Sequence, residues 1–187
     1  MPLEQPEYNV AYQGAGFEIR RYAPRLVAET LIVDKKPKAA TAGFRRLANY
    51  LLGENEGRRS GPATSLGEKV QLAVGVPYVQ YSTDEGTVLQ FPIGRRWTLD
   101  STPLPKDPLV HIRALRHARV AAQRYSGMWS EARFRIQREL LERALNAADV
   151  PVVGGPQWAR YDPPWMPWFA RRNEIWFEIA PDWSPNA

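Results

Sequence analysis

Few side chains in this sequence are of the types that commonly perform chemistry. It contains no cysteine and only two histidines. The missing thiol excludes disulfides, thiolate catalysis and cysteine-based zinc or iron–sulfur sites. His111 lies between Val110 and Ile112, so strand alternation places it on the opposite, solvent-facing side. His117 falls in a predicted turn. Neither histidine is a strong candidate for a metal ligand, and we predict no metal site.

Three carboxylates are the remaining candidates for acid–base chemistry: Glu29, Glu174 and Glu178. A carboxylate buried against tryptophans would have a raised pKa and could serve as a general acid. Alternation places Glu174 and Glu178 on one face of their strand, which is more often the outer face. No Ser-His-Asp set, metal-ligand cluster or phosphate-binding loop accompanies them. The sequence therefore favours a non-enzymatic function over catalysis, without excluding an enzyme.

A second feature is the aromatic stretch from Trp158 to Glu178, which holds four of the seven tryptophans and three prolines. Its pattern predicts a strand that ends at Pro163, a short apolar connection, and a closing strand at 174–179. Loops are normally polar, so a connection this apolar must pack on a core, cover a cavity or meet a ligand. It either plugs one end of a barrel or forms the lip of an apolar binding site.

The elements that must position these residues follow from hydrophobic periodicity. Helical spacing predicts helices at 39–52 and 131–148, the second with Ser130 as its N-cap. The segment 54–69 is predicted to be a polar loop, and 94–108 an extended Pro-rich linker. Strands are predicted at 8–13, 17–22, 26–33, 70–82, 87–93, 110–113 and 119–125.

An internal repeat relates the two halves of the chain. At a spacing of 93 residues, Ile19, Arg20, Val27 and Ala28 align with Ile112, Arg113, Val120 and Ala121, and a helix follows in each half. We therefore predict an α+β fold, a distorted antiparallel β-barrel of about eight strands from two pseudo-symmetric repeats, with two helices packed on it. Residues 1–187 would form a single domain, with repeat one at about 8–97 and repeat two at about 109–180. A concave, mostly apolar groove along the pseudo-axis would be a natural ligand site.

Charge and composition limit the classes of binding partner that we expect. The net charge is +5 and the pI about 9.6, but the arginine doublets are scattered and no helix carries a basic stripe, so we do not expect nucleic-acid binding. No apolar run is long enough to span a membrane, and the first ten residues lack the features of a secretory signal. We expect a cytoplasmic protein with a small-molecule partner; its oligomeric state is not predicted.

The segment YDPPWMPWFARRNEIWFEI resembles the YxPPxxPxxxRRNEVxxEV signature near the end of SOUL haem-binding proteins. The family pattern also recurs as FEIRRYAPRLVAET, AGFRRLANYLLG, the LPKDP linker and RYSGMWSEARF, so the resemblance covers nearly everything from Tyr8 to Ile179. One segment departs from it. Where family members usually carry KIxMTxPV, residues 69–78 read KVQLAVGVPY, which retains the lysine and proline but lacks the Met-Thr pair. A function tied to that segment in other members does not carry over.

The resemblance implies a tetrapyrrole, such as haem b, held non-covalently in an apolar groove beside the first helix and near the Pro-Pro loop. By position its walls would be Phe44, Leu47, Ala48 and Leu51 on the helix and Trp165, Met166 and Trp168 on the loop. Arg45, Arg46, Arg171 and Arg172 could reach the propionates.

The resemblance implies no axial ligand with certainty. Met166, Met128 or Tyr161 could substitute for histidine, and some family members bind the ring without a protein ligand. The lack of a good histidine ligand therefore does not exclude tetrapyrrole binding, but it argues against a redox or oxygen-activating haem enzyme. The expected function is a haem or tetrapyrrole binding protein, acting as carrier, buffer or sensor. The alternative, by fold analogy, is a gyrase-inhibitor-like effector-binding domain or hydrolase acting on another planar apolar ligand.

Overall fold

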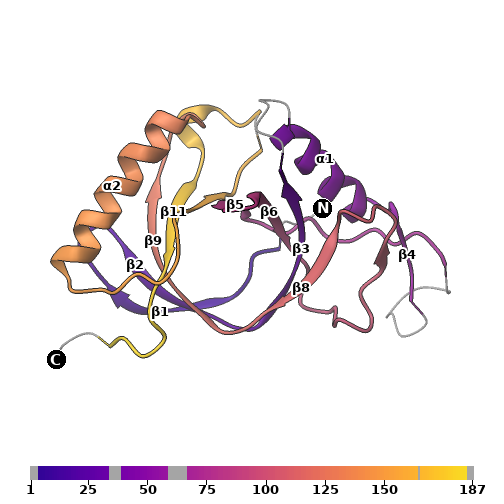
Figure 1. Ribbon diagram of the computed structural model, residues 1–187, viewed down its shortest axis with the longest axis horizontal. Coiled ribbons are helices and arrows are strands. Elements are labelled where there is room, and N and C mark those ends of the chain that lie inside the picture. Colours follow the sequence, from indigo (N-terminus) through magenta and orange to yellow (C-terminus); the bar gives the residue numbers. More distant parts are fainter. Residues whose placement is uncertain (1–3, 34–38, 59–66, 164, 185–187) are drawn as a thin grey trace. The chain divides into compact units, whose positions relative to one another are not determined.

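The computed structural model describes residues 4–33, 39–58, 67–163 and 165–184 (Figure 1). They divide into two compact units, each built from two separate stretches of chain. The first unit comprises residues 4–6 and 24–116, and the second comprises residues 7–23 and 117–184. Each contains several antiparallel strands and one long helix, so the predicted α+β class is confirmed.

The first unit has a four-stranded antiparallel sheet in the order β5-β6-β3-β8. A pair of short strands, β4 and β7, forms a small separate sheet. The helix α1 packs on β3 and β6. The elements are β3 (Arg25–Ile32), α1 (Ala39–Leu51), β4 (Asn55–Glu56), β5 (Tyr78–Thr83), β6 (Gly86–Pro92), β7 (Leu104–Pro105) and β8 (His111–Leu115).

The second unit has a five-stranded antiparallel sheet in the order β1-β2-β9-β11-β10. Its helix α2 lies along β9 and β11 (Figure 1). The elements are β1 (Tyr8–Gln13), β2 (Glu18–Tyr22), β9 (Ala118–Tyr125), α2 (Glu131–Ala147), β10 (Gln157–Arg160), the short 3₁₀ helix η1 (Trp168–Ala170) and β11 (Asn173–Glu178).

The repeat predicted from the sequence matches the strand bounds. The spacing of 93 residues superimposes β2 on β8 and β3 on β9, residue for residue. The pairing, however, crosses between repeats: β2 pairs with β9, and β8 pairs with β3. Each sheet is therefore completed by a strand from the other half of the sequence. This exchange explains why neither unit is a continuous segment.

Both helices pack where the sequence predicted them. Ser130 caps α2, with its hydroxyl oxygen accepting a hydrogen bond from the Arg133 N–H at 3.2 Å. Leu141 and Leu145 of α2 are fully buried in the core of the second unit. In the first unit, Gly43 allows α1 to approach β3 closely, because a Cβ at this position would lie 2.4 Å from Ile32 Cδ1.

Two predictions for the segment between α1 and β6 need correction. The strand predicted at 70–82 is confined to β5 (Tyr78–Thr83), although Val70 and Leu72 are buried in the core. The predicted polar loop 54–69 contains the short strand β4, and its residues 59–66 lie outside the described chain. Asn55 ties β4 to the end of α1 and to Val70. Its buried amide donates to the carbonyl oxygens of Tyr50 and Val70, each at 2.8 Å, and accepts from the Val70 N–H at 2.9 Å.

Candidate functional site

The sheet of the second unit has one face for the core and another for polar chemistry. Residues directly opposite each other on neighbouring strands project to the same side. Ile19, Ala121, Phe177 and their neighbours project toward α2 and form the hydrophobic core. The intervening positions, among them Arg20 and Glu174, project to the opposite side. The registers Glu174↔Arg124 and Glu18↔Ala122 place all these side chains over the same three strands.

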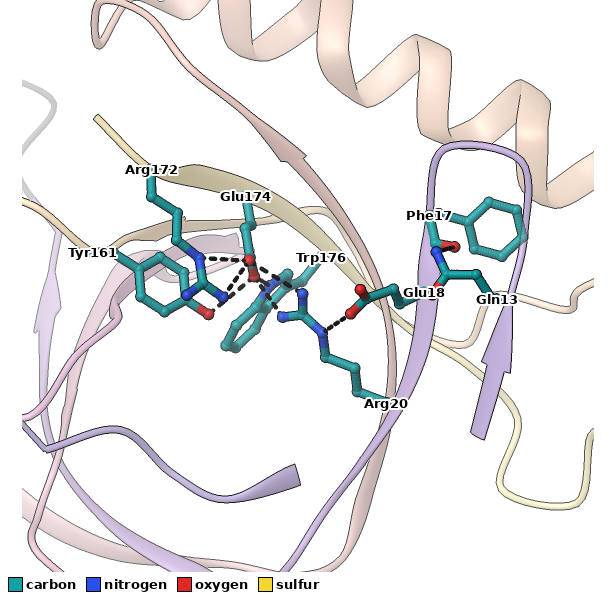
Figure 2. A network of polar contacts seen from close by, with 8 residues as sticks. All are labelled: Gln13, Phe17, Glu18, Arg20, Tyr161, Arg172, Glu174 and Trp176. Carbon is teal, nitrogen blue, oxygen red and sulfur yellow. Dashed lines mark hydrogen bonds and ion pairs between the residues drawn. The ribbon is translucent and has the colours of Figure 1, made fainter. Parts of the chain in front are cut away.

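Glu174 is the centre of a buried network on this second face (Figure 2). One carboxylate oxygen, Oε2, accepts from Arg20 at 2.6 Å, from the Tyr161 hydroxyl at 3.0 Å and from Trp176 Nε1 at 2.6 Å. The other, Oε1, accepts from Arg20 at 3.2 Å and from two nitrogens of Arg172 at 3.0 and 2.8 Å. Each oxygen therefore has three donors.

The centre of this network is buried, whereas Arg172 at its edge is partly exposed. Glu174 has no exposed surface and Arg20 has 3%. Burial by itself would raise the pKa of Glu174, but hydrogen bonds from Arg20 and Trp176 and the charges of Arg20 and Arg172 outweigh it and lower the pKa. Burial also raises the pKa of the Tyr161 hydroxyl, and the adjacent Glu174 charge adds to this. The carboxylate is thus ionised while its tyrosine partner stays protonated.

This finding corrects the expectation for the acid–base candidates. The sequence predicted that Glu174 and Glu178 both lie on the outer face of their strand. This is wrong for Glu174, which is buried, and right for Glu178, which is exposed. The expected rise in pKa is also wrong in sign, so Glu174 cannot act as a general acid near neutral pH. Glu29, in the first unit, accepts hydrogen bonds from Gln90 at 2.8 Å and from Arg113 at 3.3 Å.

The repeat shows that this network is special to the second unit. Arg113 occupies the place in the repeat that Arg20 occupies in the first half, yet its side chain is 56% exposed. Its carboxylate partner, Glu29, comes from β3 and not from the strand equivalent to β11. Strand geometry alone therefore does not require a buried ion pair at this position. The pair is buried in the second unit and exposed at the equivalent position of the first.

A pocket of about 380 Å³ opens beside the network. Charged residues dominate its lining: Glu18, Arg20, Arg124, Arg172 and Glu174. Glu18 accepts from Arg20 Nε at 2.8 Å, and the Tyr8 ring lies 4.4 Å from the Arg20 guanidinium. Of these residues, the sequence indicated only Glu174, as an acid–base candidate, and Arg172, as a partner of the propionates. A usable signal existed in the three consecutive apolar residues of β11 between Glu174 and Glu178, because such a run is typical of a strand that is buried on both faces.

The network also anchors the aromatic loop 161–172, whose two ends are joined by hydrogen bonds. The Tyr161 N–H donates to the Arg172 carbonyl at 3.2 Å, and the Arg172 N–H donates to Asp162 at 2.5 Å. Within the loop, Arg171 Nε donates to the Met166 carbonyl at 2.7 Å, and its guanidinium lies 4.9 Å from the Trp129 ring. The two arginines predicted to meet propionates thus also hold the loop in shape.

Three aromatic side chains of this loop point outward. Trp165 is 83% exposed, Trp168 55% and Phe169 65%, and the last two rings are in edge-to-face contact at 5.7 Å. Met166 is half-buried. Of the two interpretations of this stretch, a plug requires buried rings; Trp158 and Trp176 are buried, whereas the three loop side chains are exposed. That the exposed rings form the lip of a binding site stays a prediction.

The predicted helix wall, in the first unit, divides into two groups. Leu47 and Leu51 have no exposed surface and belong to the core, so the structure does not support them as direct ligand contacts. Phe44 is 41% exposed and packs edge-on against the rings of Tyr78 and Phe91. Ala48 is half-buried and Arg45 exposed.

Arg46, the other basic residue of this helix, is engaged within the first unit. It donates to Asp107 at 3.0 Å and to Thr30 at 2.9 Å. Among the apolar members of the predicted helix wall, only Phe44 and Ala48 keep surface that a ligand could contact.

The residues considered as iron ligands differ in exposure. His111 and His117 are both exposed, as is Met128, and Met166 on the aromatic loop is half-buried. The Tyr161 hydroxyl is buried and donates to Glu174. Across the described residues, no group of three or more histidine, aspartate or glutamate side chains could hold a metal ion.

Comparison with known proteins supports the resemblance seen in the sequence. The family model described as "SOUL heme-binding protein" matches residues 3–178. No curated protein matches significantly. Neither helix in the described part of the chain is long and apolar enough to cross a membrane.

Solved structures share the fold at low identity. The EcmrR C-terminal domain is 10% identical with a TM-score of 0.62, covering 90% of this chain and 98% of that one. A hydrolase from Listeria innocua is 10% identical with a TM-score of 0.55, covering 96% and 94%. In the EcmrR–DNA complex the match has 9% identity and a TM-score of 0.60, and spans 57% of the EcmrR chain.

Proposed function

Because the chain belongs to the SOUL heme-binding protein family, we propose that it binds haem or a related tetrapyrrole non-covalently, as a carrier, buffer or sensor. The observation that carries the proposal is the aromatic loop 161–172. It exposes three large rings, and hydrogen bonds join its two ends. Exposed rings on a fixed loop are suited to a planar apolar ligand, because little conformational entropy is lost on binding.

A tetrapyrrole ring would cover apolar surface that these side chains expose to water. Trp165 and Trp168 expose most of their rings, and each Å² of apolar surface removed from water contributes about 25 cal/mol. Offset stacking of aromatic faces adds about 0.5–1.5 kcal/mol per pair. Two tryptophans can therefore account for a tenfold to hundredfold gain in affinity, at about 1.4 kcal/mol per factor of ten.

The cationic groups near the loop fit the carboxylates of a porphyrin unequally. Arg172 donates two hydrogen bonds to Glu174 and lies 3.8 Å from the Tyr161 ring, which leaves it little freedom to turn outward. Arg171 belongs to the loop itself, where its Nε donates to the Met166 carbonyl. Because a guanidinium on the loop can pair with a carboxylate of a ligand held there, we assign the propionate contact in this unit to Arg171.

The donor set favours a bound ring over a ligated iron. The two histidines are exposed, and Tyr161 is committed to Glu174. When bound, the haem iron would supply its usual redox and ligand-binding chemistry, and the protein would contribute apolar faces and a cation. Metal-free porphyrin should accordingly bind about as well as haemin.

A haemin titration tests the proposal. Soret absorbance and tryptophan quenching should saturate near one equivalent for the wild type. The double variant Trp165→Ala, Trp168→Ala should bind at least about tenfold more weakly. A matched control, Ile136→Ala with Leu140→Ala, removes two exposed apolar side chains from α2 in the same unit and should bind like the wild type. Non-saturating binding that all three proteins share would refute the proposal. Saturable binding of other planar aromatics but not haemin would favour an effector-binding module instead.

A further inference from the structure

The pocket beside Glu174 has a charge balance that selects its ligand. Its lining contains three arginines, Arg20, Arg124 and Arg172, against two carboxylates, Glu18 and Glu174. Both carboxylates are already paired: Glu18 with Arg20, and Glu174 with Arg20 and Arg172. The paired groups cancel one another, and the lining retains one positive charge.

That remaining charge belongs to Arg124. This side chain is exposed, lines the pocket and has no hydrogen bond or ion pair to any other described residue. It lies on β9 directly across from Glu174, whose oxygens are saturated by three donors each. A guanidinium that lines a pocket next to a saturated carboxylate is available to an incoming anion.

We propose that this pocket is a binding site for a small organic monocarboxylate, with Arg124 as its anchor. The planar fork of a guanidinium pairs with a carboxylate through two parallel hydrogen bonds. The single unbalanced charge favours a monoanion, because a dianion such as phosphate would also meet the negative charges of Glu18 and Glu174. The site lies on the sheet of the second unit and does not rest on the proposed tetrapyrrole site.

The shape of the pocket indicates how large that acid can be. A volume of about 380 Å³ is at the lower end of the range for ligand pockets, which suits one ring or a short chain. Tyr8 gives the lining an aromatic side chain. Gly16 leaves its part of the wall open, since a Cβ there would meet nothing within 4 Å. A single-ring aromatic acid therefore fits both the charge and the space.

Benzoate is the probe for the test, titrated into the full chain at constant ionic strength and followed by amide chemical shifts. For the wild type we expect saturable shifts, with an affinity on the order of 1 mM, centred on Gly16, Arg124 and Glu174. Arg124→Gln should weaken binding at least about tenfold, because it removes a charge-assisted contact. Arg124→Lys should fall between the two, since it keeps the charge but loses the fork.

Three controls make the outcome decisive. Arg21→Gln removes an exposed arginine of β2 that does not line the pocket, and should leave benzoate affinity within about twofold. Uncharged benzamide should not compete, and haemin affinity should not change in Arg124→Gln. The proposal is overturned if benzoate shifts do not saturate, if Arg21→Gln and Arg124→Gln weaken binding equally, or if Arg124→Gln impairs only haemin binding. If the wild type does not bind haemin, the benzoate readouts still decide this proposal.

Discussion

Replacing Glu174 with glutamine should strongly destabilise the second unit, and the size of the effect follows from the hydrogen bonds. Glutamine has nearly the shape of glutamate, so packing is preserved. Whichever carboxylate oxygen becomes an amide nitrogen, three donors lose their acceptor and face a donor instead. Arg20, which is 3% exposed, would lose its buried carboxylate partner and keep only the partly exposed Glu18. Removing one member of a buried ion pair typically costs about 3–5 kcal/mol, and we expect a loss in that range.

The assay is urea unfolding at neutral pH, followed by circular dichroism and tryptophan fluorescence. Glu178→Gln is the matched control, because it makes the same change at an exposed position of the same strand and should cost less than about 0.5 kcal/mol. If Glu174→Gln unfolds within about 1 kcal/mol of the wild type, Glu174 does not hold this network together. The argument that links the network to the aromatic loop would then be wrong.

Three further predictions concern stability. The pKa of Glu174 is lowered from 4.5 in the folded protein, so its stabilising contribution is complete above about pH 4.5 and is lost as the pH falls through the pKa of the folded state. The difference in unfolding free energy between the wild type and Glu174→Gln should therefore shrink on acidification. A constant difference in urea unfolding from about pH 6 to pH 3 would contradict this. Tyr161→Phe deletes one hydrogen bond to a charged group and should cost about 2 kcal/mol by the same assay, with an unchanged stability arguing against the contact. Leu47→Ala leaves a cavity in the first unit's core and should lower stability by about 2–5 kcal/mol, whereas the exposed Trp165→Ala should change thermal unfolding very little; equal effects would contradict the burial of Leu47.

Much of the fold could be predicted because its signals are local. The helix predicted at 39–52 spans Ala39–Leu51, and Ser130 caps the second helix as its side-chain chemistry indicates. The repeat was visible from four aligned residues, and the strand bounds confirm its register. The exchange of β2 and β8 was not visible, because pairing between distant strands leaves no mark in either strand's own sequence.

The site was harder to predict, for a physical reason found in β11. Alternation identifies an outer face only when one side of a strand meets solvent, and five of the six residues of β11 are buried. Glu174 therefore follows the rule of a strand covered on both faces. Its partner Arg20 lies 154 residues away in sequence, a contact that no local pattern could reveal. The aromatic loop was found because its composition departs so strongly from that of an ordinary loop.

The most direct test of tetrapyrrole binding at the aromatic loop uses metal-free protoporphyrin IX, followed by quenching of tryptophan fluorescence. Without iron, no axial ligand can contribute, so the affinity reports only apolar contacts and charge pairing with the protein. We predict saturation near one equivalent, an affinity within a few-fold of that for haemin, and at least about tenfold weaker binding in Trp165→Ala, Trp168→Ala. Binding that does not saturate, or that the double variant leaves unchanged, would contradict a tetrapyrrole site at residues 161–172.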